Sequence, residues 1–220
     1  MAAPAFELAS GAEGRWTGTP HGAAVVCVNG GTAARVPGTW SASLEWLVGA
    51  VAPRFPRLGF VEVRYRVKSW HRLDLCVADG AAAVDAAREA GAERIVLLGF
   101  SMGGAVATSN AAAPEVEAVV GVNPWLPPQL DLAPLRGRRL AIVHGTLDAP
   151  LPGIPGVKPA QSAAAAARAA AAGVEVEREL VRGGLHAVAL RRRSGDGVLV
   201  LPGATRYRDF VVRELERFCA

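Results

Sequence analysis

The sequence predicts an α/β fold, with a mainly parallel, twisted sheet and helices on both of its faces. Short apolar runs alternate with longer segments of helical composition along most of the chain, and this alternation is typical of consecutive strand–helix units. The chain has 220 residues, of which 51% are hydrophobic and 20% are charged. That is enough to bury the core of one large domain. We therefore expect a single domain over residues 1–220, with its core at about residues 23–218.

Six short segments are the expected strands. In chain order they cover residues 23–28, 60–65, 94–98, 118–122, 140–143 and 174–181. Most of these are continuous apolar runs, which strands carry when both faces of a parallel sheet are buried. The segments between them have helical patterns, so the strands are expected to follow one another in strand–helix units.

Five helices are expected at residues 41–51, 73–90, 101–111, 159–172 and 207–218. Pro159 suits the first position of a helix, and Gly91 and Gly173 stand where a left-handed residue commonly ends one. The segment 162–172 is mostly alanine, which favours an intrinsically stable helix with little side-chain chemistry. We expect that helix to be scaffolding.

Charge and cysteine content exclude several classes of function. The net charge is +4 and the pI is near 9.4, but the positive residues are mostly scattered singly, so no nucleic-acid partner is expected.

The amino terminus has no signal-peptide core and no run of about 20 apolar residues occurs, so neither secretion nor a membrane partner is expected. The three widely spaced cysteines favour a reducing, cytoplasmic location. No metal or other cofactor is expected, because no His, Cys or carboxylate cluster has ligand spacing.

A glycine-flanked serine follows the expected strand at residues 94–98. Gly99 and Gly103 lie two residues before and after Ser101, and they allow a sharp turn that pushes the serine out of the strand end. A serine hydroxyl is inert at neutral pH unless a base takes its proton and donors receive the developing negative charge. Ser101 is therefore the candidate nucleophile, and the alternative is a glycine-rich turn with an idle serine.

An acid and a histidine follow two later strands. Asp148 comes five residues after the strand at 140–143, and His186 follows the strand at 174–181. Ligands of an open parallel sheet gather beyond the carboxyl ends of its strands, so we expect both side chains beside Ser101. An imidazole accepts the serine proton, while a carboxylate on its other nitrogen fixes the tautomer. Asp131 is the alternative acid, and His144 is interpreted as structural.

With this order of serine, acid and histidine, the chain resembles the α/β-hydrolase superfamily over roughly residues 23–218. More loosely, it is similar to the small dienelactone-hydrolase-like members that lack a cap domain. The resemblance implies that Ser101 is the nucleophile, Asp148 the acid and His186 the base. Dienelactone hydrolases themselves use a cysteine nucleophile, where this chain has a serine.

The resemblance also identifies residues 29–32, Asn-Gly-Gly-Thr, as an oxyanion-hole loop. The backbone N–H groups of Gly31 and Met102 are the expected donors, and Met102 lies at a helix amino terminus whose dipole favours negative charge. Thr32 is an alternative donor, and a simple turn is the alternative role of the loop. The further candidate pocket residues are Asn29, Gly30, Thr32, Trp70 and Trp125. The two tryptophans follow strands at the same edge, where an indole can wall an apolar pocket or pack in the core.

These residues predict a serine hydrolase that cleaves a carboxylic ester or a related acyl bond of a small molecule. The acyl group would pass through an acyl-enzyme on Ser101. An acyltransferase or thioesterase on the same triad, and a non-catalytic hydrolase-like binding protein, are the alternatives. The expected absence of a cap predicts an open site for small or exposed acyl groups.

Overall fold

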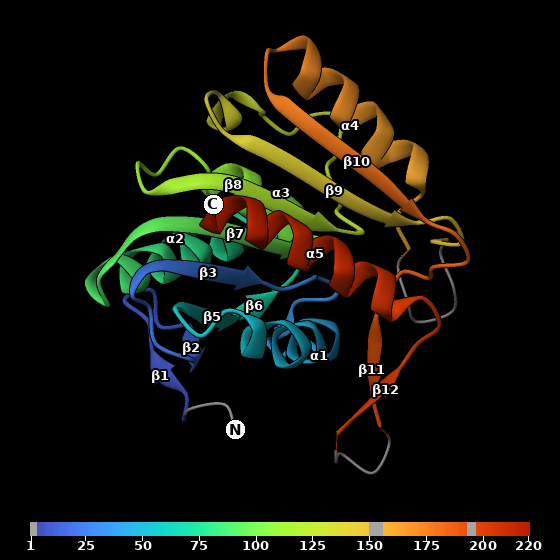
Figure 1. Cartoon of the computed structure of the whole chain (residues 1–220). Coiled ribbons are helices and arrows are strands. Elements are labelled where there is room, and N and C mark those ends of the chain that lie inside the picture. The colour runs from blue at the N-terminus through green and yellow to red at the C-terminus, as the bar shows by residue number, and fades with distance from the viewer. Residues whose placement is uncertain (1–3, 150–155, 193–196) are drawn as a thin grey trace.

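The computed structural model describes residues 4–149, 156–192 and 197–220 (Figure 1). Within these residues, eight strands form one twisted sheet in the order β1-β2-β5-β3-β7-β8-β9-β10. They are β1 (Phe6–Glu7), β2 (Glu13–Thr17), β3 (Gly22–Val28), β5 (Leu58–Arg64), β7 (Ala92–Phe100), β8 (Val116–Val122), β9 (Arg139–Gly145) and β10 (Glu175–Val181). The neighbours from β5 to β10 are all parallel, whereas β2 pairs antiparallel with β5 and with β1. The predicted mainly parallel sheet is confirmed.

Helices cover both faces of this sheet. They are α1 (Ala42–Val51), α2 (Leu73–Glu89), α3 (Gly103–Asn110), α4 (Pro159–Ala171) and α5 (Ala204–Cys219). One apolar core joins the sheet to α2, α3 and α4, and a second core joins its other face to α1 and α5. Side chains along β7 alternate between the two cores, with Ile95 and Leu97 in the first and Val96 and Leu98 in the second. This alternation explains why the central strands are apolar on both faces.

Several short elements have no counterpart among the predicted ones. Besides β1 and β2, they are β4 (Val36–Pro37), β6 (Val67–Lys68), β11 (Ala189–Arg191), β12 (Val198–Val200) and the 3-10 turns η1 (Ala52–Arg54), η2 (Trp70–Arg72) and η3 (Ala133–Leu135). β4 pairs with β6, and β11 and β12 form a hairpin that projects from the body of the molecule (Figure 1). These pieces are too short or too polar to give the continuous apolar pattern of a central strand.

Among the described residues, no helix combines the length and the apolar character that crossing a lipid bilayer requires.

Candidate active site

Ser101 lies on the sharp turn between β7 and α3. Its φ is 55°, a left-handed conformation that residues other than glycine seldom adopt. Its N–H donates to the Val122 carbonyl at 3.1 Å, and its own carbonyl accepts the N–H groups of Trp125 at 2.7 Å and Gly104 at 2.9 Å. These backbone bonds on both sides hold the turn, so the strain at Ser101 is fixed by its surroundings.

Two glycines allow the turn to pack closely. A Cβ atom at Gly103 would overlap the carbonyl oxygen of Val28 in β3, and one at Gly99 would overlap the carbonyl oxygen of Gly103. Backbone atoms cannot move aside as a flexible side chain can, so these positions require glycine. The sequence motif is therefore explained by contacts among β3, β7 and α3.

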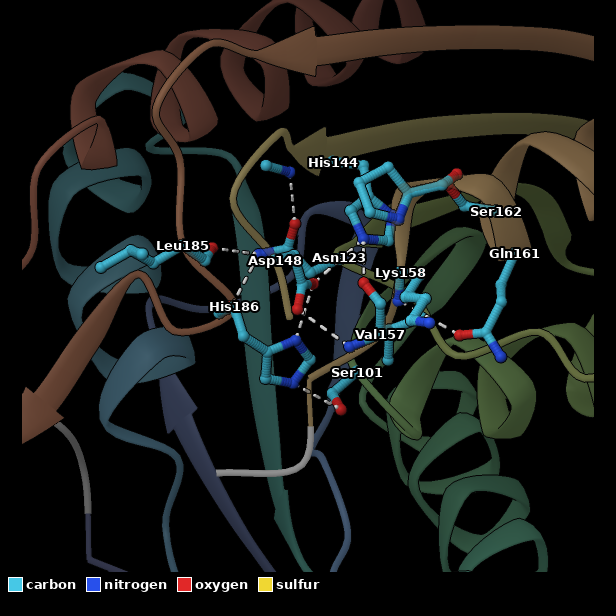
Figure 2. Close-up of polar contacts among 12 residues, drawn as sticks. Ser101, Asn123, His144, Asp148, Val157, Lys158, Gln161, Ser162, Leu185 and His186 are labelled. Atoms are coloured by element: carbon cyan, nitrogen blue, oxygen red, sulfur yellow. Dashed lines mark hydrogen bonds and ion pairs between the residues drawn. The ribbon is translucent and has the colours of Figure 1, made fainter. Parts of the chain in front are cut away.

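The structure brings Ser101, His186 and Asp148 together at the carboxyl edge of the sheet (Figure 2). His186 Nε2 lies 3.0 Å from Ser101 Oγ, and His186 Nδ1 lies 2.8 Å from Asp148 Oδ2. The relative exposure of these residues is only 7%, 7% and 2%, in the same order. The alternative acid, Asp131, is exposed and accepts the N–H of Ala133. It is therefore Asp148 that reaches the histidine.

His144, the penultimate residue of β9, makes a second contact with the acid. Its Nε2 lies 3.0 Å from Asp148 Oδ2 and 2.8 Å from the Val157 carbonyl oxygen, while Asp148 Oδ1 accepts the Val157 N–H at 2.8 Å. Both neighbours of Nε2 are acceptors, so Nε2 carries the proton. Burial opposes ionisation of Asp148, but the hydrogen bonds from His144, His186 and Val157 outweigh it and lower the pKa of this carboxyl below its ordinary value. Asp148 is therefore ionised at neutral pH.

Asn123 joins the acid loop to the histidine loop, and the sequence analysis missed it. Its Nδ2 donates to the carbonyl oxygens of Leu185 at 3.0 Å and His186 at 2.6 Å, and its Oδ1 accepts the Gly145 N–H at 2.8 Å. It is fully buried and has a φ of 47°. The sequence does carry a signal, because Asn123 is a polar residue directly after a strand at the same edge as the predicted triad.

The loop after β3 is held by its own side chains. Asn29 Oδ1 accepts the Gly30 N–H at 2.6 Å, and Asn29 Nδ2 donates to the Thr39 carbonyl at 2.8 Å. Thr32, the alternative oxyanion donor, uses its hydroxyl oxygen to accept the Ala34 N–H at 3.1 Å. The Gly30 N–H is thus occupied, and the side chain of Thr32 stabilises its own turn.

The two expected oxyanion donors lie in neighbouring segments. Gly31 packs so tightly on Met102 that a Cβ atom at Gly31 would overlap the Met102 sulfur. Among the described residues, neither the Gly31 N–H nor the Met102 N–H has an acceptor within the chain. The role of these two N–H groups as oxyanion donors stays a prediction.

Two hollows adjoin Ser101. The first measures about 280 Å³ and is called the polar hollow after the polar side chains of His186, Lys68 and Ser41. It is also lined by Gly31 and by the apolar side chains of Trp40, Phe100 and Leu190. Burial lowers the pKa of Lys68, whose Nζ donates to Thr39 Oγ1 at 2.9 Å. Asn29 and Gly30 also line this hollow.

The apolar hollow, of about 240 Å³, is lined by Trp70, Met102, Trp125 and Val157, together with Gly156 and Gln161. Both tryptophans are partly buried and also pack against the core that contains α2 and α3. Each tryptophan therefore lines the hollow and also packs in the core, which are the two roles that the sequence leaves open.

A larger hollow of about 610 Å³ lies away from Ser101, between β2 and α1. Its charged side chains are paired with one another, because Arg15 bonds both Glu62 and Glu45. It lacks a nucleophile beside a base, so the chemistry points to the hollows at Ser101. Within the described ranges, no three His, Cys, Asp or Glu side chains gather as a metal site would require.

Comparisons with known proteins agree with this architecture. Residues 64–196 match the sequence profile of the dienelactone hydrolase family. No curated protein sequence matches the chain.

Solved structures of similar shape include a hormone-sensitive lipase from a metagenome library, with a TM-score of 0.70 and 17% identity over 97% of this chain and 84% of that one. A dienelactone hydrolase-like promiscuous phosphotriesterase from metagenomic libraries has a TM-score of 0.67 and 15% identity over 99% and 98%. An α/β hydrolase from a deep-sea metagenome library of the Medee basin has a TM-score of 0.67 and 18% identity over 97% of both chains. At these identities the likeness shows a shared fold, and the predicted α/β-hydrolase fold is confirmed.

Proposed function

The chain belongs to the dienelactone hydrolase family, and from this premise we propose that it is a serine hydrolase that cleaves a carboxylic ester or a related acyl bond. The substrate is a small-molecule ester or related acyl compound, and its acyl group passes through an acyl-enzyme on Ser101. One observation carries the proposal: the hydrogen-bonded path from Asp148 through His186 to the Ser101 hydroxyl. A serine in this position has the base and the orienting carboxylate that its reactivity requires.

Acylation begins at the Ser101 hydroxyl. His186 Nε2, at 3.0 Å, accepts its proton as Oγ attacks the substrate carbonyl carbon. Asp148 accepts the hydrogen of His186 Nδ1 and so keeps the lone pair of Nε2 directed at the serine. The carbonyl oxygen becomes an oxyanion, which the N–H groups of Gly31 and Met102 stabilise.

Collapse of the tetrahedral intermediate breaks the bond to the leaving group. The proton on His186 Nε2 passes to the leaving alcohol oxygen, so the alcohol departs neutral and the acyl group stays on Ser101 Oγ. Water then attacks the acyl carbon while His186 accepts a proton from it. The carboxylic acid leaves, and the proton returns to Ser101, which restores the starting state.

The proposal is tested by covalent labelling with a fluorophosphonate, followed by peptide mapping. We expect one label on Ser101 in the wild-type chain and none in Ser101→Ala. The same variant should lose p-nitrophenyl acetate hydrolysis by at least about a thousandfold. Ser109→Ala, which changes a serine of α3 away from the turn, is the matched control and should keep both properties. A folded wild-type protein that neither takes the label nor hydrolyses the ester would favour the non-catalytic binding protein instead.

A further inference from the structure

The two hollows beside Ser101 differ in their relation to the base. His186 lines the polar hollow, together with Lys68 and Ser41. The apolar hollow is lined instead by Trp70, Trp125 and Val157. In Figure 2, His186 lies on one side of Ser101, and Val157 and Gln161 lie on the other. The two parts of an ester that meet at Ser101 can therefore occupy separate spaces, of which only the polar hollow has the base and a lysine in its lining.

The chemistry of the leaving group decides which part lies where. The alcohol oxygen must receive its proton from His186 Nε2, so the alcohol part leaves on the side of the histidine. That places the alcohol part in the polar hollow. The acyl part extends from the carbonyl carbon to the other side of Ser101, toward the two tryptophans. Apolar walls of this kind favour a hydrocarbon over a polar acyl group.

A second hollow, of about 480 Å³, lies beside α4 and adjoins the apolar hollow. Gly156 and Gln161 line both hollows. The second hollow is lined largely by apolar groups of Leu126, Pro128 and alanines of α4, together with the polar side chains of Lys158, Gln161 and Arg168. Ala160 and Ala164 are one helical turn apart on its wall, and their small side chains leave the space beside the helix open.

We infer that this acyl groove, lined by Trp70, Trp125, Val157, Leu126, Ala160 and Ala164, binds the hydrocarbon chain of a long, unbranched acyl group. The preferred substrates are then esters of medium-chain to long-chain carboxylic acids. The inference rests on the proposed function of Ser101. The inferred acyl groups are longer than the small or exposed ones that the expected absence of a cap predicts. The alanine-rich helix α4 also has a second role here, because it forms a wall of the groove besides being scaffolding. Each methylene that leaves water on binding should improve kcat/KM by up to about fourfold.

The test compares two variants of α4 on two series of esters. Ala164→Phe fills the acyl groove, whereas Ala167→Phe places the same side chain on α4 at a position that does not line the groove. Both alanines are exposed, so the two variants are matched in burial. The acyl series is p-nitrophenyl acetate, butyrate, octanoate and dodecanoate, each below its solubility limit. The alcohol series is methyl, butyl and octyl acetate.

In the wild-type protein kcat/KM should rise with acyl length, mainly through KM. Ala164→Phe should lower kcat/KM for octanoate and dodecanoate by at least about tenfold and leave acetate unchanged. Ala167→Phe should match the wild type on every ester, and neither variant should change the alcohol series. Thermal unfolding checks that the variants fold, and Ala160→Leu, which also narrows the groove, replaces Ala164→Phe if that variant does not.

Three results would overturn the inference. They are a wild-type kcat/KM that does not rise with acyl length, an equal change of kcat/KM in the two phenylalanine variants, and a fall of kcat/KM that is confined to the alcohol series. Each of these leaves the proposed function intact as long as acetate is hydrolysed through Ser101. If no ester is hydrolysed and Ser101 takes no fluorophosphonate, the proposed function itself fails, and the inference fails with it.

Discussion

Ser101 and Asn123 are the two non-glycine residues of the described chain that have positive φ, at 55° and 47°. They directly follow the neighbouring strands β7 and β8, and backbone or side-chain hydrogen bonds hold both. Such conformations cost about 1–3 kcal/mol each and persist where the surroundings fix them. Asparagine tolerates this region better than serine does. The strain at Ser101 therefore coincides with the candidate nucleophile, and Asn123 fixes the loops that carry its partners.

Replacing Asp148 with Asn tests the orienting role of the acid. Asp148→Asn removes the negative charge that holds the His186 tautomer, so kcat for p-nitrophenyl acetate should fall by up to about ten-thousandfold, as in serine proteases with the same change. KM should change little. Stopped assays with purified protein measure both constants, and thermal unfolding confirms that the variant is folded.

Asp131→Asn is the matched control for that variant. Its carboxylate is exposed and bonds only the Ala133 N–H among the described residues, so activity should stay at the wild-type level. A large loss in Asp131→Asn together with a normal Asp148→Asn would assign the acid to the other residue.

Individual site residues can be predicted from sequence where a motif places them after a strand. Ser101, Asp148 and His186 each follow a recognisable strand, and the structure brings their side chains together, although their roles stay predictions until the variants are measured. His144 and Asn123 were harder to find, because their importance depends on which loop atoms their side chains reach. The sequence indicates a structural role for His144, and in the structure its Nε2 contacts the acid. Side-chain contacts between separate loops leave no periodic pattern in a sequence.

At the scale of elements, patterns succeed for buried strands and fail for polar ones. The six expected strands form within a few residues of their predicted ends, because burial on both faces imposes continuous apolar runs. β2 contains Glu13 and Arg15, and Arg15 pairs with the buried Glu62 of β5. A strand that is only partly buried and pairs through charged side chains does not give an apolar run, so the sequence pattern does not predict β2.

The packing of α3 against β3 predicts a large effect of one methyl group. Gly103→Ala would place its Cβ on the Val28 carbonyl oxygen, and overpacking of this kind destabilises by about 1–3 kcal/mol or more. Chemical denaturation should show this loss, together with reduced labelling of Ser101 by a fluorophosphonate because the turn must shift.

Gly49→Ala is the control, since Gly49 lies inside α1 with nothing within 4 Å of a new Cβ. In a helix interior this change should be neutral or stabilise by about 0.5–1 kcal/mol. Equal destabilisation of the two variants would mean that the contact with Val28 does not limit the turn.

At the scale of the whole molecule, one charged cluster joins segments from both ends of the chain. Glu45 of α1 bonds Arg191 of β11 at 2.8 and 2.9 Å and Arg15 of β2 at 3.0 Å. The hydrogen bond from Arg191, aided by that from Arg15, outweighs burial and lowers the pKa of Glu45 from 4.5 to about 2. Burial raises the pKa of the neighbouring Glu62, so that carboxyl does not share this dependence.

This depressed pKa predicts how stability depends on pH. Because the folded chain binds the Glu45 proton more weakly than the unfolded chain, the stabilisation is present above about pH 4.5 and is lost as the pH falls toward about 2. Urea unfolding measured across this pH range should show that the free energy of unfolding falls less toward low pH in Glu45→Gln than in the wild type. Glu117→Gln, which removes an exposed pair with Arg94, should follow the wild-type curve. Parallel curves for the wild type and Glu45→Gln would contradict the prediction.

The position of β2 beside β5 determines how the protein tolerates truncation at its amino terminus. The family match begins only at residue 64, yet the preceding residues supply β3 with its Gly31 loop and the strand that covers the edge of β5. A shortened chain that starts after β2 would present a row of unpaired amide and carbonyl groups along the almost wholly buried β5. Such an edge recruits strands from other molecules, so the shortened protein should precipitate during expression.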